Sequence, residues 1–295
     1  MVKDFKTGTL YRVATGVIGL PVYFLALAFD YFNSIGVLIV SLAVSLLSLY
    51  EYYKISDKEK DGKPFVVFGI IAGAAVNLIM YYYAFGNRLG FYCPADLDAR
   101  MIFILMTLFL SVILVIQLFG RPIKGGIYSL SATVFGVVYI VFFFSHIILL
   151  KALQNGFLYI LILNIVVMIN DTMAYFGGSL FGRHKLNFPV SPNKSWEGYF
   201  SGLIFSVIFM AATNEIYDVF LNIRLFSFAE SIVLGIVFSM LGHIGDLVES
   251  AVKRDGLKKD SGSLLPGHGG MWDVFDALIF SLPFFYYYLI LKGVN

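Results

Sequence analysis

The sequence predicts an all-α integral membrane protein that crosses the bilayer about nine times. Hydrophobic residues make up 59% of the 295 residues and charged residues only 14%, and the mean hydropathy is +0.83. A soluble domain of this length does not have so apolar a composition. Apolar runs long enough to span a bilayer recur along the whole chain, at about 12–30, 34–53, 65–85, 101–119, 127–150, 157–177, 199–214, 229–248 and 274–291.

The distribution of Lys and Arg predicts how these helices are oriented. Cytoplasmic loops of membrane proteins carry an excess of both residues. With a cytoplasmic N-terminus, the inside segments hold 16 of the 21 Lys and Arg and the outside segments hold five. This bias supports nine spans with the C-terminus outside. It also places the loops at 178–198 and 249–273 together on the cytoplasmic side.

The chain divides into two regions by the chemistry that its side chains offer. Residues 1–165 contain about five spans and the start of the sixth, and they show no motif that carries chemistry. The first apolar run is too long for a signal peptide, so we expect it to remain as the first helix. Residues 166–295 hold the remaining spans and both polar loops. We therefore expect the catalytic region within 166–295.

The end of the sixth span and the loop after it contain the first candidate site residues. Asp171 lies inside an apolar run, where an isolated carboxylate costs at least ~2.5 kcal/mol. We therefore expect it to face the bundle interior or a wet cavity. The loop ends in Ser-Pro-Asn-Lys-Ser-Trp-Glu-Gly, residues 191–198. In this segment Ser195 is suited to cap the next helix, Trp196 to anchor it at the interface, and Lys194 to contact phosphate.

The stretch from Gly245 to Asp276 is the most densely charged part of the chain, although it lies between the last two apolar runs. Charge beside a bilayer is costly, so such a cluster is by default a candidate functional site. It reads GDLVESAVKRDGLKKDSGSLLPGHGGMWDVFD. The glycines of its Pro-Gly-His-Gly-Gly turn, residues 266–270, allow positive φ and a close approach of the backbone to an anion.

Helical spacing brings the acids of this stretch together. If residues 245–254 are helical, Asp246, Glu249 and Lys253 share one face. Asp273 and Asp276 are three residues apart at the start of the last span and can also point the same way. Paired carboxylates are hard oxygen ligands suited to Mg²⁺ or Mn²⁺. The basic residues of the stretch are placed for phosphate oxygens: Lys253, Arg254, Lys258 and Lys259. The alternative is a solvated loop in which Glu249 and Lys253 form an ordinary i,i+4 pair.

Residues 250–276 resemble the signature of the phosphatidate cytidylyltransferases, also called CDP-diacylglycerol synthases. The resemblance rests on Ser250, Lys253, Arg254, Lys259, Asp260, Gly262, Pro266, His268, Gly269, Gly270, Asp273 and Asp276. Residues 191–198, with the earlier Asp171-Thr172 and Phe181-Gly182-Arg183, are similar to further segments of the same family in the same order. One position departs, because Val274 stands where the family usually has Arg. The two matches cover about a third of the chain.

The resemblance implies that CTP and phosphatidate react to give CDP-diacylglycerol and pyrophosphate. It implies Mg²⁺ or Mn²⁺ as cofactor, with one or two ions held by Asp246, Asp273 and Asp276. The residues expected to act in catalysis are Asp246, Lys253, Arg254, Lys259, Asp260, His268, Asp273 and Asp276. Those expected to bind substrate are Asp171, Lys194, Ser195, Lys253, Arg254, Lys259, His268, Gly269 and Gly270. Glu249 is expected only to support the ligands from behind.

Three other functions remain open at this point. A CTP-dependent lipid kinase and a cytidylyltransferase for another lipid phosphate would use similar residues. A cation-coupled transporter would also place Asp171 and Asp246 in membrane helices. A CDP-alcohol phosphotransferase is disfavoured, because the chain lacks the pattern Asp-x-x-Asp-Gly-x-x-Ala-Arg. We expect a multi-pass protein of a bacterial-type cytoplasmic membrane with its active site on the cytoplasmic side. We expect no nucleic-acid partner. The interpretation is compatible with a homo-oligomer.

Overall fold

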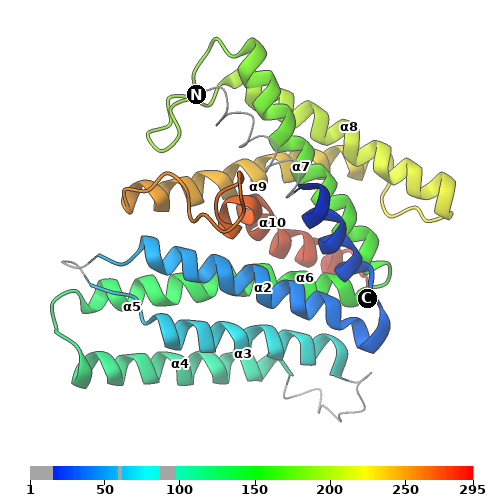
Figure 1. Cartoon of the computed structure of the whole chain (residues 1–295). Helices are drawn as coiled ribbons and strands as arrows, with labels where there is room; N and C mark the ends of the chain where they lie inside the picture. Colours follow the sequence, from blue (N-terminus) through cyan, green and yellow to red (C-terminus); the bar gives the residue numbers. More distant parts are fainter. Residues whose placement is uncertain (1–15, 59–61, 87–97, 295) are drawn as a thin grey trace.

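The computed structural model describes residues 16–58, 62–86 and 98–294, and these residues form an all-α protein (Figure 1). A short apolar helix at Gly16–Ala28 comes first. It is followed by α2 (Tyr31–Ile55), α3 (Val66–Phe85), α4 (Asp98–Gly120), α5 (Gly126–Phe135), the π-helical segment η2 (Gly136–Phe142), α6 (Phe143–Ala152), α7 (Gly156–Phe181), α8 (Trp196–Leu221), α9 (Phe228–Asp255) and α10 (Met271–Leu291).

The helices agree with the predicted spans. The segments α5, η2 and α6 are continuous, so the described residues contain eight helices long and apolar enough to cross a membrane, besides Gly16–Ala28. The predicted first span starts before Gly16, at residues outside those described. The N-terminus, on which the predicted orientation depends, also lies outside the described residues. The all-α, multi-pass fold class is therefore confirmed, with the ninth helix described over 13 residues.

Two helices extend furthest beyond their apolar runs. α8 extends beyond the predicted 199–214 because its last turns carry Glu215 and Asp218, which pair with Arg224 at 3.4 and 2.8 Å. α9 continues beyond 248 with Glu249 and Lys253 on its buried face. Hydropathy underestimates both helices, since ion pairs satisfy charged side chains that a composition window counts as polar.

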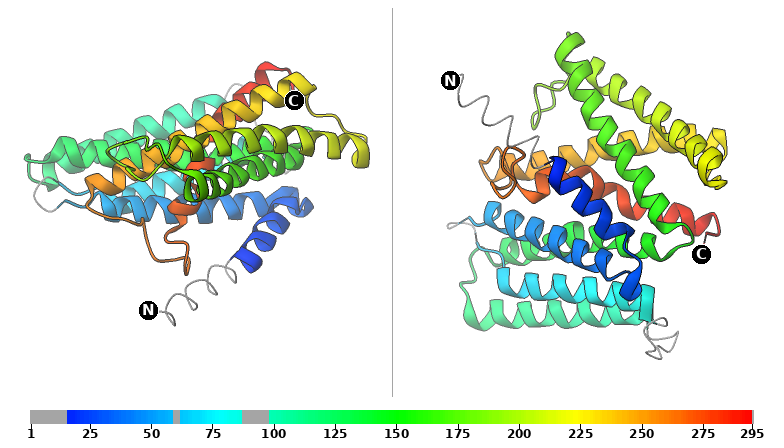
Figure 2. Two further views of the ribbon diagram at one scale, coloured as in Figure 1. Left: turned by 90° about the horizontal axis from the view of Figure 1, so that it is seen from above. Right: turned by 45° about the vertical axis from the view of Figure 1, so that its right-hand side comes forward.

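The helices are arranged as one bundle and a tilted hairpin. α2, α3, α4, the span 126–152, α9 and α10 run side by side, whereas α7 crosses α9 and α10 steeply (Figures 1 and 2). α8 packs on α7, and small residues bring the two backbones together. A Cβ added to Gly177 would lie 2.4 Å from the Cβ of Ser201. The hairpin therefore behaves as a close-packed unit beside α9.

Contacts between loops define one polar end of the bundle. Lys58 pairs with Asp255 at 2.7 Å, and Tyr128 donates to the Ser56 carbonyl at 2.8 Å. The loops after α2, α4 and α9 thus meet at the same end, as the alternation of predicted inside segments requires. Whether this end faces the cytoplasm stays a prediction.

Candidate active site

A close approach of α9 and α10 forms the centre of the site. A Cβ added to Gly245 would lie 2.7 Å from the carbonyl oxygen of Asp276 and 2.9 Å from the Cα of Ala277. Glycine at this position therefore lets the two helices touch at the level of Asp246 and Asp276. The predicted face of α9 points toward α10, with Glu249 and Lys253 buried on it.

Three carboxylates meet at this crossing. One ligand oxygen from each of Asp246, Glu249 and Asp276 lies within 4.8 Å of the others. Glu249 and Asp276 are 1% and 6% exposed, so solvent water does little to screen the repulsion between their charges. Oε1 of Glu249 receives no hydrogen bond from the described residues. Buried carboxylates so close together repel one another unless a cation lies between them. The donor set and its unsatisfied oxygen fit a divalent cation with oxygen ligands.

Two lysines balance part of this charge. Lys194, from the α7–α8 loop, lies 2.6 Å from Oδ2 of Asp246. Lys253 lies 2.6 Å from both Oε2 of Glu249 and Oδ1 of Asp273. Lys253 is 9% exposed and is occupied by these two acids. Its ammonium group therefore holds Glu249 and Asp273 in position, whereas Lys194 lines the adjoining cavity.

Asp273, which sequence analysis placed among the metal ligands, lies outside the group of three. Its Oδ2 accepts hydrogen bonds from the backbone N–H and hydroxyl of Ser261 at 2.8 and 2.9 Å, and from the N–H of Gly270 at 2.7 Å. Its Oδ1 accepts from Lys253. These donors satisfy both oxygens, so Asp273 fastens the loop 256–270 to the start of α10. Glu249, which we expected only to support the metal ligands, lies in the cluster where Asp273 was expected.

Sequence analysis missed Glu51, which holds the same loop from α2. Its carboxylate accepts hydrogen bonds from the N–H groups of Met271 and Trp272 at 2.9 and 3.0 Å. It thereby satisfies two of the free N–H groups at the start of α10. The Ser261 hydroxyl lies 2.9 Å from Glu51 and 2.9 Å from Asp273, so the two acids share its single proton. A Cβ on Gly270 would lie 2.3 Å from the Glu51 carboxylate. A single acid at the polar end of an otherwise apolar run was the available signal.

The remaining predicted residues of the 249–273 loop lie on its surface. Arg254, Lys259, Asp260 and His268 are exposed, and Arg254 donates to the Lys258 carbonyl at 3.0 Å. The predicted glycine turn is present, with φ of +83° at Gly267 and +97° at Gly269. Gly269 and Gly270 serve the loop by giving room to Asp273 and to Glu51.

A polar cavity of about 480 Å³ adjoins the cluster at Asp246. It lies among α7, the α7–α8 loop and α9, and both Asp171 and Lys194 line it. Ser195 also borders it, but its hydroxyl caps α8 by accepting the Gly198 N–H at 3.2 Å. Lining residues that sequence analysis did not single out include Lys185, Tyr199 and His243. The rings of Tyr199 and His243 pack 4.8 Å apart. The cavity thus combines cations, acids and an aromatic wall beside the cluster.

Val274 does not line this cavity. Its side chain is 43% exposed on the surface of α10. The next residue, Phe275, instead packs its ring against that of Tyr23. Valine at this position therefore leaves the carboxylate cluster intact.

Comparison with known proteins identifies the family of the chain. A model of the cytidylyltransferase family matches residues 10–291. Proteins named phosphatidate cytidylyltransferase from Staphylococcus epidermidis and Staphylococcus haemolyticus are 44% and 45% identical over 130 residues. One from Staphylococcus aureus is 42% identical over 132 residues. Each match covers 44% of this chain and 48%, about half, of the relative. Because the family model spans nearly the whole chain, the protein belongs to the cytidylyltransferase family.

Proposed function

We propose that the protein transfers CMP from CTP to phosphatidate, giving CDP-diacylglycerol and pyrophosphate. The observation that carries the proposal is the cluster of Asp246, Glu249 and Asp276, which adjoins through Asp246 a polar cavity that Lys185 and Lys194 also line. The names of the staphylococcal relatives support this choice of substrates. In the reaction a phosphate oxygen of phosphatidate attacks the α-phosphorus of CTP, and the bond to the β-phosphate oxygen breaks.

We infer that Asp246, Glu249 and Asp276 hold Mg²⁺ or Mn²⁺, because hard carboxylate oxygens suit these ions. When bound, one or two such ions supply positive charge that offsets repulsion between the two anionic substrates. Both substrates already carry negative charge, so the reaction needs positioning more than a strong base. This ligand set replaces Asp273 with Glu249. Asp273 acts in the proposal as a positioning residue, through Lys253 and Ser261.

The basic residues divide by where they lie. Lys194 can exchange its contact with Asp246 for a substrate phosphate oxygen, because it lines the cavity beside that acid. Arg254, Lys259 and His268 are exposed on the loop above and are available for the triphosphate or the lipid phosphate. Asp260 lies on the same exposed loop and is assigned only a supporting part. Asp171 would border the substrate from the α7 side of the cavity.

The test follows the label from CTP into lipid with purified protein, phosphatidate and Mg²⁺, with EDTA as the control. We expect label from α-labelled CTP to enter the lipid phase and label from γ-labelled CTP to leave as pyrophosphate. Transfer of the γ label would instead identify a CTP-dependent lipid kinase. Absence of transfer from folded protein supplied with several lipid phosphates would overturn the proposal.

The proposed active site faces the cytoplasm, where the nucleotide is found. The excess of Lys and Arg in the loops at this end of the bundle supports that orientation. Ser263→Cys, made in a Cys93→Ser background so that it carries the single thiol, tests the orientation in intact cells with a thiol reagent that does not cross the membrane. Protection in intact cells and labelling after permeabilisation are expected, whereas labelling in intact cells would reverse the topology.

A further inference from the structure

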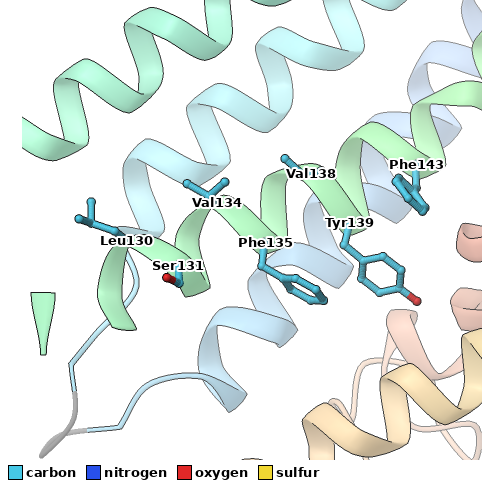
Figure 3. Close-up of a pocket in the computed structure, with 7 residues that line it drawn as sticks. All are labelled: Leu130, Ser131, Val134, Phe135, Val138, Tyr139 and Phe143. Atoms are coloured by element: carbon cyan, nitrogen blue, oxygen red, sulfur yellow. The ribbon is translucent and has the colours of Figure 1, made fainter. Parts of the chain in front are cut away.

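A second cavity lies on the membrane-spanning surface away from the polar one. It has a volume of about 650 Å³ and runs along the span formed by α5, η2 and α6 (Figure 3). Its walls are two rows of side chains spaced four residues apart, as expected for neighbouring ridges on a helix. One row is Leu130, Val134 and Val138, and the other is Ser131, Phe135, Tyr139 and Phe143. We call this cavity the apolar furrow.

The apolar furrow has the length and position of a lipid chain. Residues 130–143 cover about 20 Å of helix at ~1.5 Å per residue. One leaflet contributes about half of the ~30 Å hydrocarbon layer. The helix begins at the polar end of the bundle, where Tyr128 contacts Ser56. Phe135 and Val138 are each 39% exposed, so the furrow is open at the side where lipid would lie. It therefore spans the depth of the leaflet that borders the active site.

Aromatic contacts connect the apolar furrow to the carboxylate cluster. The rings of Tyr139 and Phe143 lie 6.3 and 6.4 Å from the ring of Phe280 on α10. Phe280 follows Asp276 by four residues, about one helical turn. The ring of Tyr139 borders the furrow while its hydroxyl points toward α10 (Figure 3). That hydroxyl is buried and has no partner among the described residues.

The π-helical segment places Tyr139 at this junction. A π-turn inserts an extra residue into a helix and is frequent at functional sites. Gly136 opens this segment, and a Cβ there would lie 2.7 Å from Leu49 and 2.8 Å from Tyr52 on α2. Close packing on α2 therefore fixes the inner side of the segment and leaves its other side to the furrow.

We propose that the apolar furrow holds an acyl chain of the lipid substrate while the lipid phosphate lies at the carboxylate cluster. The proposal rests on the proposed function and adds where the lipid binds. The polar cavity includes Asp246 of the cluster, whereas the furrow is connected to α10 through the ring contact of Tyr139 with Phe280. In the proposal, nucleotide and lipid therefore approach from different sides. A chain gains no hydrophobic energy on moving from bilayer to protein. The furrow therefore selects its occupant by shape and by the phosphate held at the cluster.

Photolabelling tests the site without requiring turnover. The wild-type protein in phosphatidylcholine nanodiscs is irradiated with phosphatidate that carries a diazirine in one acyl chain. We expect label on residues 126–152 at several times its level on α4, a span whose membrane window is only 11% buried. Excess phosphatidate should compete for the label on 126–152, and excess phosphatidylcholine should not. Equal labelling of both spans, or equal competition by the two lipids, would mean boundary lipid only and would overturn the proposal.

A matched pair of substitutions gives a second test. Val138→Trp fills the apolar furrow, whereas Val115→Trp adds the same indole to an exposed valine of α4. We expect kcat/KM for long-chain phosphatidate to fall about tenfold in V138W, less than the ~100-fold that misplaced reacting groups cost. V115W should match wild type. With dihexanoyl phosphatidate, V138W should be normal, and its KM for CTP should not change.

These outcomes separate the two proposals. If wild type transfers no CMP to either lipid, the proposed function fails, and the competition in photolabelling still decides whether lipid occupies the furrow. If wild type is active but V138W keeps full activity on long chains, the furrow proposal fails alone. An equal loss on short and long chains in V138W would show general damage to η2 and would likewise overturn it.

Discussion

Two groups of acids lie around the start of α10 and have opposite surroundings. Glu51 and Asp273 accept hydrogen bonds from backbone N–H groups, from Ser261 and from Lys253. Asp246, Glu249 and Asp276 instead face one another, with one oxygen of Glu249 receiving no hydrogen bond. The first pair is satisfied by the protein and fastens a loop. The second group is the one that we propose holds a cation. Carboxylates that meet at one helix start thus take different parts according to the hydrogen-bond donors around them.

The largest expected effect comes from the cluster. Asp276→Asn or Asp246→Asn should lower CMP transfer by more than about 100-fold, because even indirect partners of a metal cost 10–100-fold. Without metal, the unfolding midpoint of Asp276→Asn in detergent should equal or exceed that of wild type, since repulsion is relieved. Glu215→Gln, at the far end of α8, is the isosteric control. Near-normal transfer in both aspartate variants would remove the cluster from the reaction.

Substitution of Glu51 or Asp273 should lower the stability of the protein first and its activity as a consequence. Glu51→Gln turns an acceptor of two backbone hydrogen bonds into a group with a competing donor, which should cost about 1–3 kcal/mol of folding free energy. Its unfolding midpoint without metal should therefore fall. The unfolding midpoint of Asp273→Asn should fall as well. Both variants should lose activity, because the loop 256–270 is less firmly held.

Metal binding separates these two roles directly. Addition of Mg²⁺ should raise the unfolding midpoint of wild type and of Asp273→Asn, because the cluster is intact in both. It should not raise that of Asp276→Asn. If Asp273→Asn loses the Mg²⁺ response while its midpoint without metal is normal, Asp273 belongs with the ligands after all.

A smaller effect is expected from the helix crossing that brings the cluster together. Gly245→Ala places a Cβ 2.7 Å from the Asp276 carbonyl oxygen. Relieving this overlap should cost about 1–3 kcal/mol and move α9 away from α10. Gly242→Ala, one turn earlier, meets nothing closer than 3.5 Å and serves as the control. Thermal unfolding and CMP transfer should both be affected in the first variant and normal in the second.

The smallest effect is expected at Val274. The side chain is 43% exposed and outside the cluster, so Val274→Arg should leave the unfolding midpoint within about 0.5 kcal/mol of wild type. Activity should be unchanged, or raised if the new guanidinium reaches phosphate. A clear loss of folding would show that packing around valine is specific.

Local patterns in the sequence were enough to predict the all-α membrane fold, the approximate spans and the face of α9 that carries Asp246, Glu249 and Lys253. Apolar periodicity and helical spacing act over a few residues, so they are visible in one chain. The same local reasoning found the glycine turn at 267 and 269 and the cap at Ser195, because both are short-range effects.

Which acids form the cluster depends on contacts between distant parts of the chain. Asp273 and Asp276 are equivalent by spacing, but hydrogen bonds from Ser261 and Gly270 satisfy the first, and the approach at Gly245 directs the second to α9. Glu51 reaches the same loop from a helix more than 200 residues earlier. The apolar furrow depends on which helix face is left uncovered. Such long-range choices arise from packing between elements, and no local pattern records them.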